Sequence, residues 1–254
     1  IFLVGCARSG TTALAAPFYF HPDVGPKRHP IDTDLGTFLD NLMEVEKHFN
    51  FSDTLERKPV YFNYFQQQPG HPDISRDYII EHDPRGPVAR KIFKMRLARH
   101  LDQKRLLGKT PENIFRVGAL LEIFTDAKCI CIHRDGRDVV SSWGNRKGHT
   151  FADYGGLEPG IRFYAERWNQ AIDYAIEAEK KFPLYVVYYE DLIKNPQEEM
   201  RKMMEFCELD TEAIDLSQVK FRFQAGQWKN RIPEEYHELL NSLLEKNLKR
   251  LGYI

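Results

Sequence analysis

A cation, two glycines and three hydroxyl residues lie close together near the start of the chain, in a pattern that suits anion binding. The segment Gly5–Thr12 reads G-C-A-R-S-G-T-T, follows the apolar run Ile1–Val4 and leads into a helix-compatible stretch from about Gly10. Where a buried strand turns into a helix, successive backbone N–H groups point to one place and the helix dipole adds partial positive charge. The sequence therefore predicts a phosphate-binding loop formed by Arg8, Ser9, Gly10, Thr11 and Thr12.

This loop departs from the nucleotide triphosphatase pattern at one informative position. Thr11 stands where the pattern G-x-x-x-x-G-K-[ST] has its lysine. A triphosphatase needs that lysine on the β- and γ-phosphates and an acidic strand end for Mg²⁺, whereas the next long apolar strand ends in His133 and Arg134. No carboxylate pair at a strand end suits a metal, so we expect no metal site. A P-loop nucleotide kinase or related phosphotransferase stays open as an alternative.

Strands and helices alternate along the chain and must bring these residues together. Apolar or β-rich runs predict strands at residues 1–4, 106–107, 128–133 and 184–189, and helical patterns lie around 114–124, 161–181, 198–206 and 233–250. Such alternation is typical of an α/β fold. We therefore expect a P-loop-like central parallel β-sheet flanked by helices, in a single domain over residues 1–254, with an irregular insertion at about 26–90 after the first helix.

Composition excludes several classes of protein. The 36 Lys and Arg residues balance 37 Asp and Glu residues, which gives a net charge of -1 and no bulk attraction to nucleic acid. No apolar run reaches the roughly 18 residues that a membrane span needs. The four cysteines are too few for a disulfide framework and are expected to be free buried thiols. We expect no nucleic-acid partner, no membrane segment and a cytoplasmic location, with an upstream anchor left open.

Three segments in order, each at a predicted strand end, carry a resemblance to a known family. They are R-S-G-T-T at 8–12, G-K-T-P at 108–111 and R-D-G-R-D-V-V-S-S at 134–142. Together they resemble the signature of the sulfotransferases that use 3'-phosphoadenosine 5'-phosphosulfate (PAPS). The similarity extends to Y-E-D-L at 189–192 and G-Q-W-K-N at 226–230, and it is closer to the Golgi-type and bacterial branch than to the cytosolic branch.

The resemblance implies a role for each of these residues. Arg8 and the loop Ser9–Thr12 would hold the 5'-phosphosulfate, and Lys109 would supply a second cation beside the transferring group. Arg134 and Ser142 would grip the 3'-phosphate. Tyr189 would contact the adenine, and Arg222 would form half of a clamp over the 3'-phosphate. Arg137 and Asp138 are instead expected to cap and pair locally at the start of the helix. The product would be 3'-phosphoadenosine 5'-phosphate (PAP), released by in-line displacement without a metal.

The general base and the acceptor are less defined by the sequence. His29 is the best candidate base because an unperturbed histidine pKa of roughly 6.5 suits proton removal near neutrality; Asp32, Glu44 or the insertion are alternatives. The acceptor is expected to offer a hydroxyl or amine on a small molecule, glycan or peptide. Nine Lys or Arg against one acid over 85–109 would attract an anionic acceptor, or form a solvated helical face. A catalytically silent PAP-binding domain is the remaining alternative.

Overall fold

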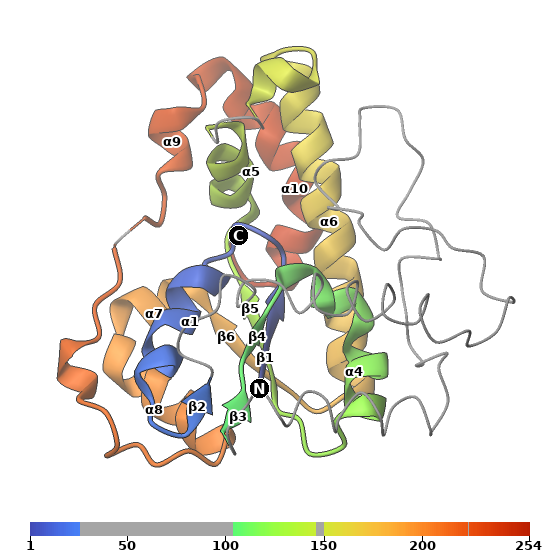
Figure 1. Cartoon of the computed structure of the whole chain (residues 1–254). Helices are drawn as coiled ribbons and strands as arrows, with labels where there is room; N and C mark the ends of the chain where they lie inside the picture. Colours follow the sequence, from blue (N-terminus) through green and yellow to red (C-terminus); the bar gives the residue numbers. More distant parts are fainter. Residues whose placement is uncertain (26–103, 146–149, 223) are drawn as a thin grey trace, which may run out of the picture.

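A four-stranded parallel sheet forms the centre of the computed structural model, which describes residues 1–25, 104–145, 150–222 and 224–254. Its strand order is β4-β1-β5-β6 (Figure 1). The strands are β1 (Phe2–Gly5), β4 (Gly108–Lys109), β5 (Cys129–His133) and β6 (Leu184–Tyr188). A separate parallel pair joins β2 (Val24–Gly25) to β3 (Arg105–Leu106). The predicted central parallel sheet is confirmed.

Helices cover the sheet on both faces and leave β1 and β5 completely buried. Alternate residues of β5 enter different cores: Cys129 and Cys131 pack on one side, Ile130 and Ile132 on the other. The first side carries α4 (Val117–Ile123), α5 (Gly136–Gly144), α6 (Leu157–Lys181) and α10 (His237–Arg250). The second carries α1 (Thr11–Phe20), α7 (Tyr189–Lys194) and α8 (Pro196–Phe206). A near-continuous apolar strand is what this two-sided burial requires.

Most predicted elements exist, with shifted boundaries. The strand predicted at 106–107 is observed one residue earlier, as β3, and Leu107 separates it from β4. The helix predicted from residue 114 begins as a 3-10 helix at Pro111–Arg116 before α4. Shorter 3-10 turns lie at Phe151–Tyr154, Leu216–Gln218 and Glu234–Tyr236, and α9 (Trp228–Arg231) precedes the last of them. The insertion predicted at 26–90 lies outside the described residues.

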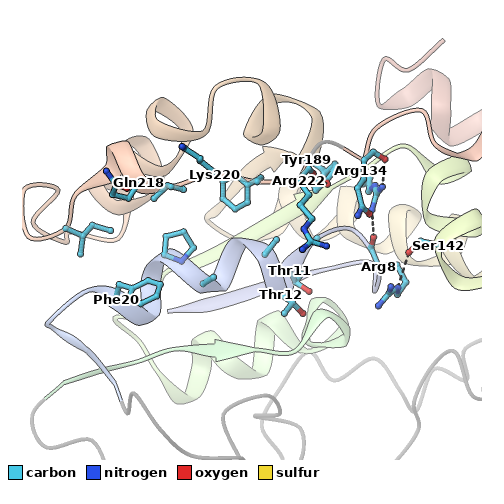
Figure 2. A pocket seen from close by; sticks show the side chains of 18 of the residues that line it. Arg8, Thr11, Thr12, Phe20, Arg134, Ser142, Tyr189, Gln218, Lys220 and Arg222 are labelled. Carbon is cyan, nitrogen blue, oxygen red and sulfur yellow. Dashed lines mark hydrogen bonds between the residues drawn. The ribbon is translucent and has the colours of Figure 1, made fainter. Parts of the chain in front are cut away.

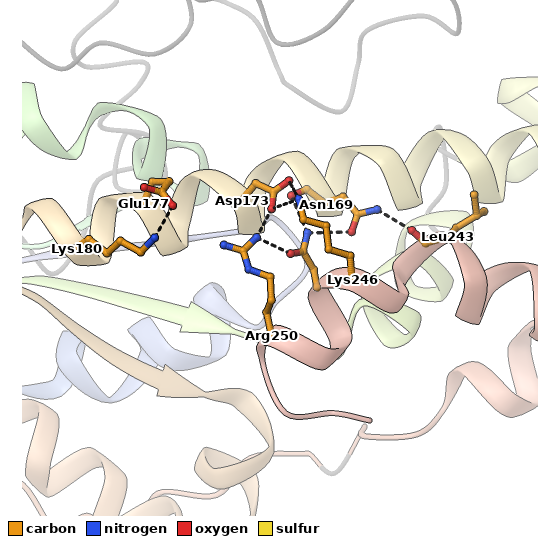
Figure 3. Close-up of polar contacts among 8 residues, drawn as sticks. Asn169, Asp173, Glu177, Lys180, Leu243, Lys246 and Arg250 are labelled. Carbon is orange, nitrogen blue, oxygen red and sulfur yellow. Dashed lines mark hydrogen bonds and ion pairs between the residues drawn. The ribbon is translucent and has the colours of Figure 1, made fainter.

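The packing of α10 against α6 includes a polar seam (Figure 3). Asn169 on α6 donates to the carbonyl of Leu243 at 2.8 Å and receives a hydrogen bond from the buried Asn247 at 3.1 Å. Asp173, one turn further, pairs with both Lys246 and Arg250 of α10. These contacts fix α10 along the long helix, where it also packs on α5.

None of the helices in the described ranges combines the length and apolar character that crossing a membrane requires. The four cysteines are free and buried, as predicted.

Candidate functional site

The predicted phosphate loop lies between β1 and α1, and its backbone has left-handed turns at Arg8 (φ 71°) and Gly10 (φ 103°). A Cβ on Gly10 would lie 2.7 Å from the Tyr189 ring, so this position needs glycine for both conformation and space. The Gly10 carbonyl accepts the first helical hydrogen bond, from the Leu14 N–H at 3.0 Å. No acidic residue occupies the first turn of α1, so its amide donors and dipole favour an external anion.

Arg134 connects this loop to a distant segment of the chain. Its two terminal nitrogens donate to the carbonyls of Arg8 at 3.1 Å and Gln224 at 2.9 Å. Its guanidinium carbon lies 4.3 Å from the centre of the Tyr189 ring, a cation–π contact. The side chain is buried, and its Nε has no hydrogen-bond partner. Arg134 therefore places a guanidinium at the base of the site while its hydrogen bonds go to main-chain carbonyls.

Arg8 and Ser142 lie next to each other, although they are 134 residues apart in the sequence. The Arg8 Nε donates to the Ser142 Oγ at 3.2 Å, and the guanidinium carbon lies 5.7 Å from the Trp143 ring centre. Arg8 is exposed, whereas Ser142 sits near the end of α5. The residues predicted for the two phosphates of the nucleotide thus line one continuous site.

The start of α5 is held by charged and polar groups behind the site. Asp135 caps the helix by accepting from the Arg137 N–H at 2.9 Å, and its carboxylate pairs with the Arg137 guanidinium. Glu190 accepts from the Asp135 N–H at 3.1 Å and from the Tyr253 hydroxyl at 2.7 Å, and burial raises the pKa of Glu190. Arg137 pairs locally, as predicted. Asp138 does not pair locally, because its carboxylate binds N–H groups of the segment near residue 226.

A cavity of about 730 Å³ is lined by Arg8, Arg134, Ser142 and Tyr189 (Figure 2). This volume lies within the roughly 300–1,000 Å³ common for small-molecule sites. One wall is α1, with Ala13, Ala16, Pro17 and Phe20. The opposite wall is the segment from Ile214 to Arg222, and the Tyr189 hydroxyl donates to the Arg222 carbonyl at 3.0 Å. The lining combines the cations Arg8, Arg134, Lys220 and Arg222 with the single carboxylate of Asp215. This cavity suits an anionic ligand with a flat apolar part.

The structure places the predicted site residues in three groups. Those that line the cavity are Arg8, Gly10, Thr11, Thr12, Arg134, Ser142, Tyr189 and Arg222. Ser9 belongs to the loop but is buried, and Lys109 is half-buried on β4 beside Leu3; both lie outside the lining. His29, with Asp32 and Glu44, lies outside the described residues.

Sequence reasoning missed most of the two walls of the cavity, and two of the missed residues are large side chains. Phe20 and Lys220 line the cavity and were not predicted. The alternation of apolar and basic residues over 219–222, V-K-F-R, is the signal that the sequence offers for an extended segment here, and all four residues line the cavity. Phe20 carries no comparable signal, because α1 is apolar nearly all round.

One group of three possible metal ligands lies among the described residues, away from this cavity. Ligand atoms of Cys131, His133 and Glu179 lie within 4.8 Å of one another. His133 Nε2 already contacts Glu179 Oε1 at 2.6 Å, and burial raises the pKa of the Cys131 thiol. Because His133 and Glu179 contact each other directly and the Cys131 thiol stays protonated, we interpret this group as part of the protein core rather than as a metal site.

Sheet and site together define an α/β protein with a phosphate-binding loop before its first helix and a cationic cavity at the carboxyl edge of a parallel sheet. Residues 1–213 match the model of the sulfotransferase family, so the chain belongs to the sulfotransferase family.

Curated relatives agree with this assignment. The chain is 28% identical over 217 residues to a protein-tyrosine sulfotransferase of Drosophila melanogaster, covering 82% of this chain but only 38% of the fly protein. It is 26% identical to protein-tyrosine sulfotransferase A of Caenorhabditis elegans, over 100% of this chain and 67% of the worm protein.

Solved structures agree on the fold. The sulfotransferase domain from the curacin biosynthetic pathway superposes with a TM-score of 0.58 at 15% identity, covering 100% of this chain and 97% of that domain. Sulfotransferase STF9 from Mycobacterium avium gives 0.57 at 16% identity, over 98% of this chain and 76% of its own. Membership of the sulfotransferase family favours sulfuryl transfer over the nucleotide kinase.

Proposed function

We propose that this protein transfers the sulfuryl group of PAPS to a hydroxyl or amine of an acceptor and releases PAP. The observation that carries the proposal is the convergence of the phosphate loop, Arg134 and Ser142 on one cavity. The loop with Arg8 and the pair of Arg134 and Ser142 lie side by side at one end of the cavity, so donors for two phosphate groups of one nucleotide converge there. The α1 dipole and the arginines supply positive charge without a metal.

The chemistry requires one bond to form and one to break. The acceptor oxygen or nitrogen attacks sulfur, the bond from sulfur to the bridging phosphate oxygen breaks, and the acceptor proton passes to a base. Negative charge grows on the bridging oxygen, so donors near the 5'-phosphate stabilise the transition state. Arg8, exposed at the cavity, is the candidate for this role.

Lys109 is the second proposed catalytic cation. It ends β4, and β4 pairs with β1, the strand that leads into the phosphate loop. Carboxyl ends of adjacent parallel strands lie at the same edge of a sheet, where α/β proteins bind their ligands. His29 stays the predicted base. Lys109→Ala should lower kcat in a transfer assay. The affinity of this variant for PAP, measured by calorimetric titration, should be nearly unchanged.

A peptide or protein is the acceptor that the relatives favour, because both curated relatives above carry the name of protein-tyrosine sulfotransferases. The basic excess at 85–109 would suit acidic residues around a tyrosine. Small molecules and glycans are the other acceptor classes predicted from the sequence. The cytoplasmic location likewise stays a prediction.

The direct test is transfer from sulfur-labelled PAPS to a panel of acidic tyrosine peptides, matched phenylalanine peptides, simple phenols and glycans. Label in tyrosine peptides alone would support the proposed acceptor class. Label in phenols or glycans alone would contradict the proposed acceptor class but would still support sulfuryl transfer. A chain that binds PAP and labels none of them would support the silent binding domain.

The kinase alternative has its own test. PAP should raise the melting temperature, since a ligand that binds only the folded state stabilises it. ATP with Mg²⁺ should raise it much less. The reverse order would favour a phosphotransferase.

A further inference from the structure

The segment Gln224–Trp228, here called the strap, lies directly after the cavity wall and is bound by a buried carboxylate. Asp138 Oδ2 accepts from the Gly226 N–H at 2.7 Å, and Asp138 Oδ1 accepts from the Trp228 N–H at 3.0 Å. Asp138 is completely buried and does not line the cavity. We propose that Asp138 is a positioning residue that fixes the strap, and through it the cationic wall of the nucleotide site.

Only an ionised carboxylate satisfies this arrangement fully. Two N–H donors approach two different oxygens, so each oxygen must be an acceptor, which an amide side chain cannot provide. Asp138 lies in the first turn of α5, where the helix dipole favours a negative charge. Gly226 has a left-handed backbone (φ 73°), which allows the chain to turn around the carboxylate.

The strap is held at its other end by groups that belong to the cavity. Arg134, which precedes α5 by two residues, donates to the Gln224 carbonyl as well as to the Arg8 carbonyl of the phosphate loop. Two residues before the strap, the Arg222 carbonyl accepts from Tyr189, and Figure 2 shows the Arg222 side chain directed toward Thr11 and Thr12.

The connection from β5 to α5 therefore orients the loop on one side and the strap on the other. Releasing the strap from Asp138 would loosen Gln224 and Arg222 without removing any group that lines the cavity. The inference rests on the proposed function, because the loosened wall is the one assigned to the nucleotide.

Hydrogen exchange and ligand binding together test this role in Asp138→Asn. The variant keeps the size of the side chain but offers one acceptor oxygen, so one strap N–H loses its partner. Exchange of peptides covering 224–228 should accelerate in the absence of ligand. PAP affinity should fall about 10- to 100-fold, the equivalent of one lost hydrogen bond to a charged group. The KM for PAPS should rise by a similar factor, with kcat at saturation within about threefold.

Asp173→Asn is the matched control, because it makes the same chemical change in a carboxylate that also holds two partners, on the seam between α6 and α10. It should leave both strap exchange and PAP affinity unchanged. If Asp138→Asn does not fold, Gly226→Ala tests the same role from the strap side. An added Cβ there meets no atom within 4 Å, so only the turn is strained, and exchange and KM should again rise together.

Two results would overturn the inference in different ways. Unchanged strap exchange, or PAP affinity within twofold of the native protein, in a folded Asp138→Asn variant would refute the positioning role alone. Native protein that binds no PAP would refute the proposed function and, with it, the consequence for the nucleotide wall.

Discussion

The cations of the cavity and those of the α6–α10 seam are held in opposite ways. In the seam, Lys246 and Arg250 meet the carboxylate of Asp173, so their charges are neutralised within the protein. In the cavity, Arg134 donates to the main-chain carbonyls of Arg8 and Gln224, which carry no net charge. The first arrangement joins two helices, and the second leaves positive charge for a ligand. An arginine's partners thus distinguish a structural cation from a binding one.

The largest effect expected from this contrast follows from Arg134→Ala. The substitution removes two hydrogen bonds that join the phosphate loop to the strap, together with the cation predicted to hold the 3'-phosphate. PAP affinity should fall on the order of 100-fold or more, since each hydrogen bond to a charged group contributes about 1.5–3 kcal/mol. Calorimetric titration with PAP measures this loss of affinity. Arg250→Ala, the seam counterpart, should leave PAP affinity unchanged, and equal losses in both variants would contradict the distinction.

Arg8→Ala should act on turnover rather than on binding. Arg8 lies exposed at the cavity beside Ser142, in position to meet charge that grows as the sulfur–oxygen bond breaks. The loss in kcat should be about 10²-fold, as for other donors aimed at transition-state charge. PAP affinity should change by much less. Arg8→Lys keeps the charge without the forked donors, so an intermediate rate is expected. A variant that loses affinity and keeps kcat would assign Arg8 to binding alone.

The seam itself should affect stability modestly. Asp173→Ala breaks the pairs with Lys246 and Arg250, whose side chains are 69% and 31% exposed. Solvent screens such pairs, so each should contribute about 0.2–1 kcal/mol to the free energy of unfolding. Urea denaturation should therefore show a small shift of midpoint without a change of slope. A loss of several kcal/mol would mean that the seam, rather than the apolar core, holds α10.

The smallest effect is expected at the four thiols. Burial raises the pKa of Cys129 to about 12 and of Cys207 to about 11, and raises the pKa of Cys6 and Cys131 as well. At pH 8, below these values, the thiols stay protonated and unreactive, and only a rise of pH toward the native pKa would form thiolate. Iodoacetamide should label none of them in the native protein at pH 8 and all four in denaturant. Rapid native labelling would show that the core around these cysteines opens.

The sequence predicted the parallel sheet and the phosphate-loop side of the cavity because both depend on local signals. An apolar run followed by G-x-x-x-x-G defines a strand, a loop and a helix N-terminus within twelve residues, and the structure has all three in place. Arg134 and Ser142 follow a strand in the same way.

Contacts between distant segments could not be predicted from the sequence, because no local signal marks them. The hydrogen bonds of Asp138 to Gly226 and Trp228 span 88 and 90 residues, and nothing near Asp138 in the sequence distinguishes it from a local helix cap. Lys220 was missed because its segment pairs with no strand among the described residues, so the alternating pattern lacks the neighbour that gives it its usual meaning.

The central claim is that one cavity binds a nucleotide through phosphates at both its 5' and 3' positions. Calorimetric titration with PAP, and separately with adenosine 5'-phosphate, tests it most directly. We predict saturable binding of PAP and, because the 3'-phosphate contacts are missing, at least about tenfold weaker binding of adenosine 5'-phosphate. Folded protein that releases no heat with PAP, or binds both nucleotides equally, would contradict the account.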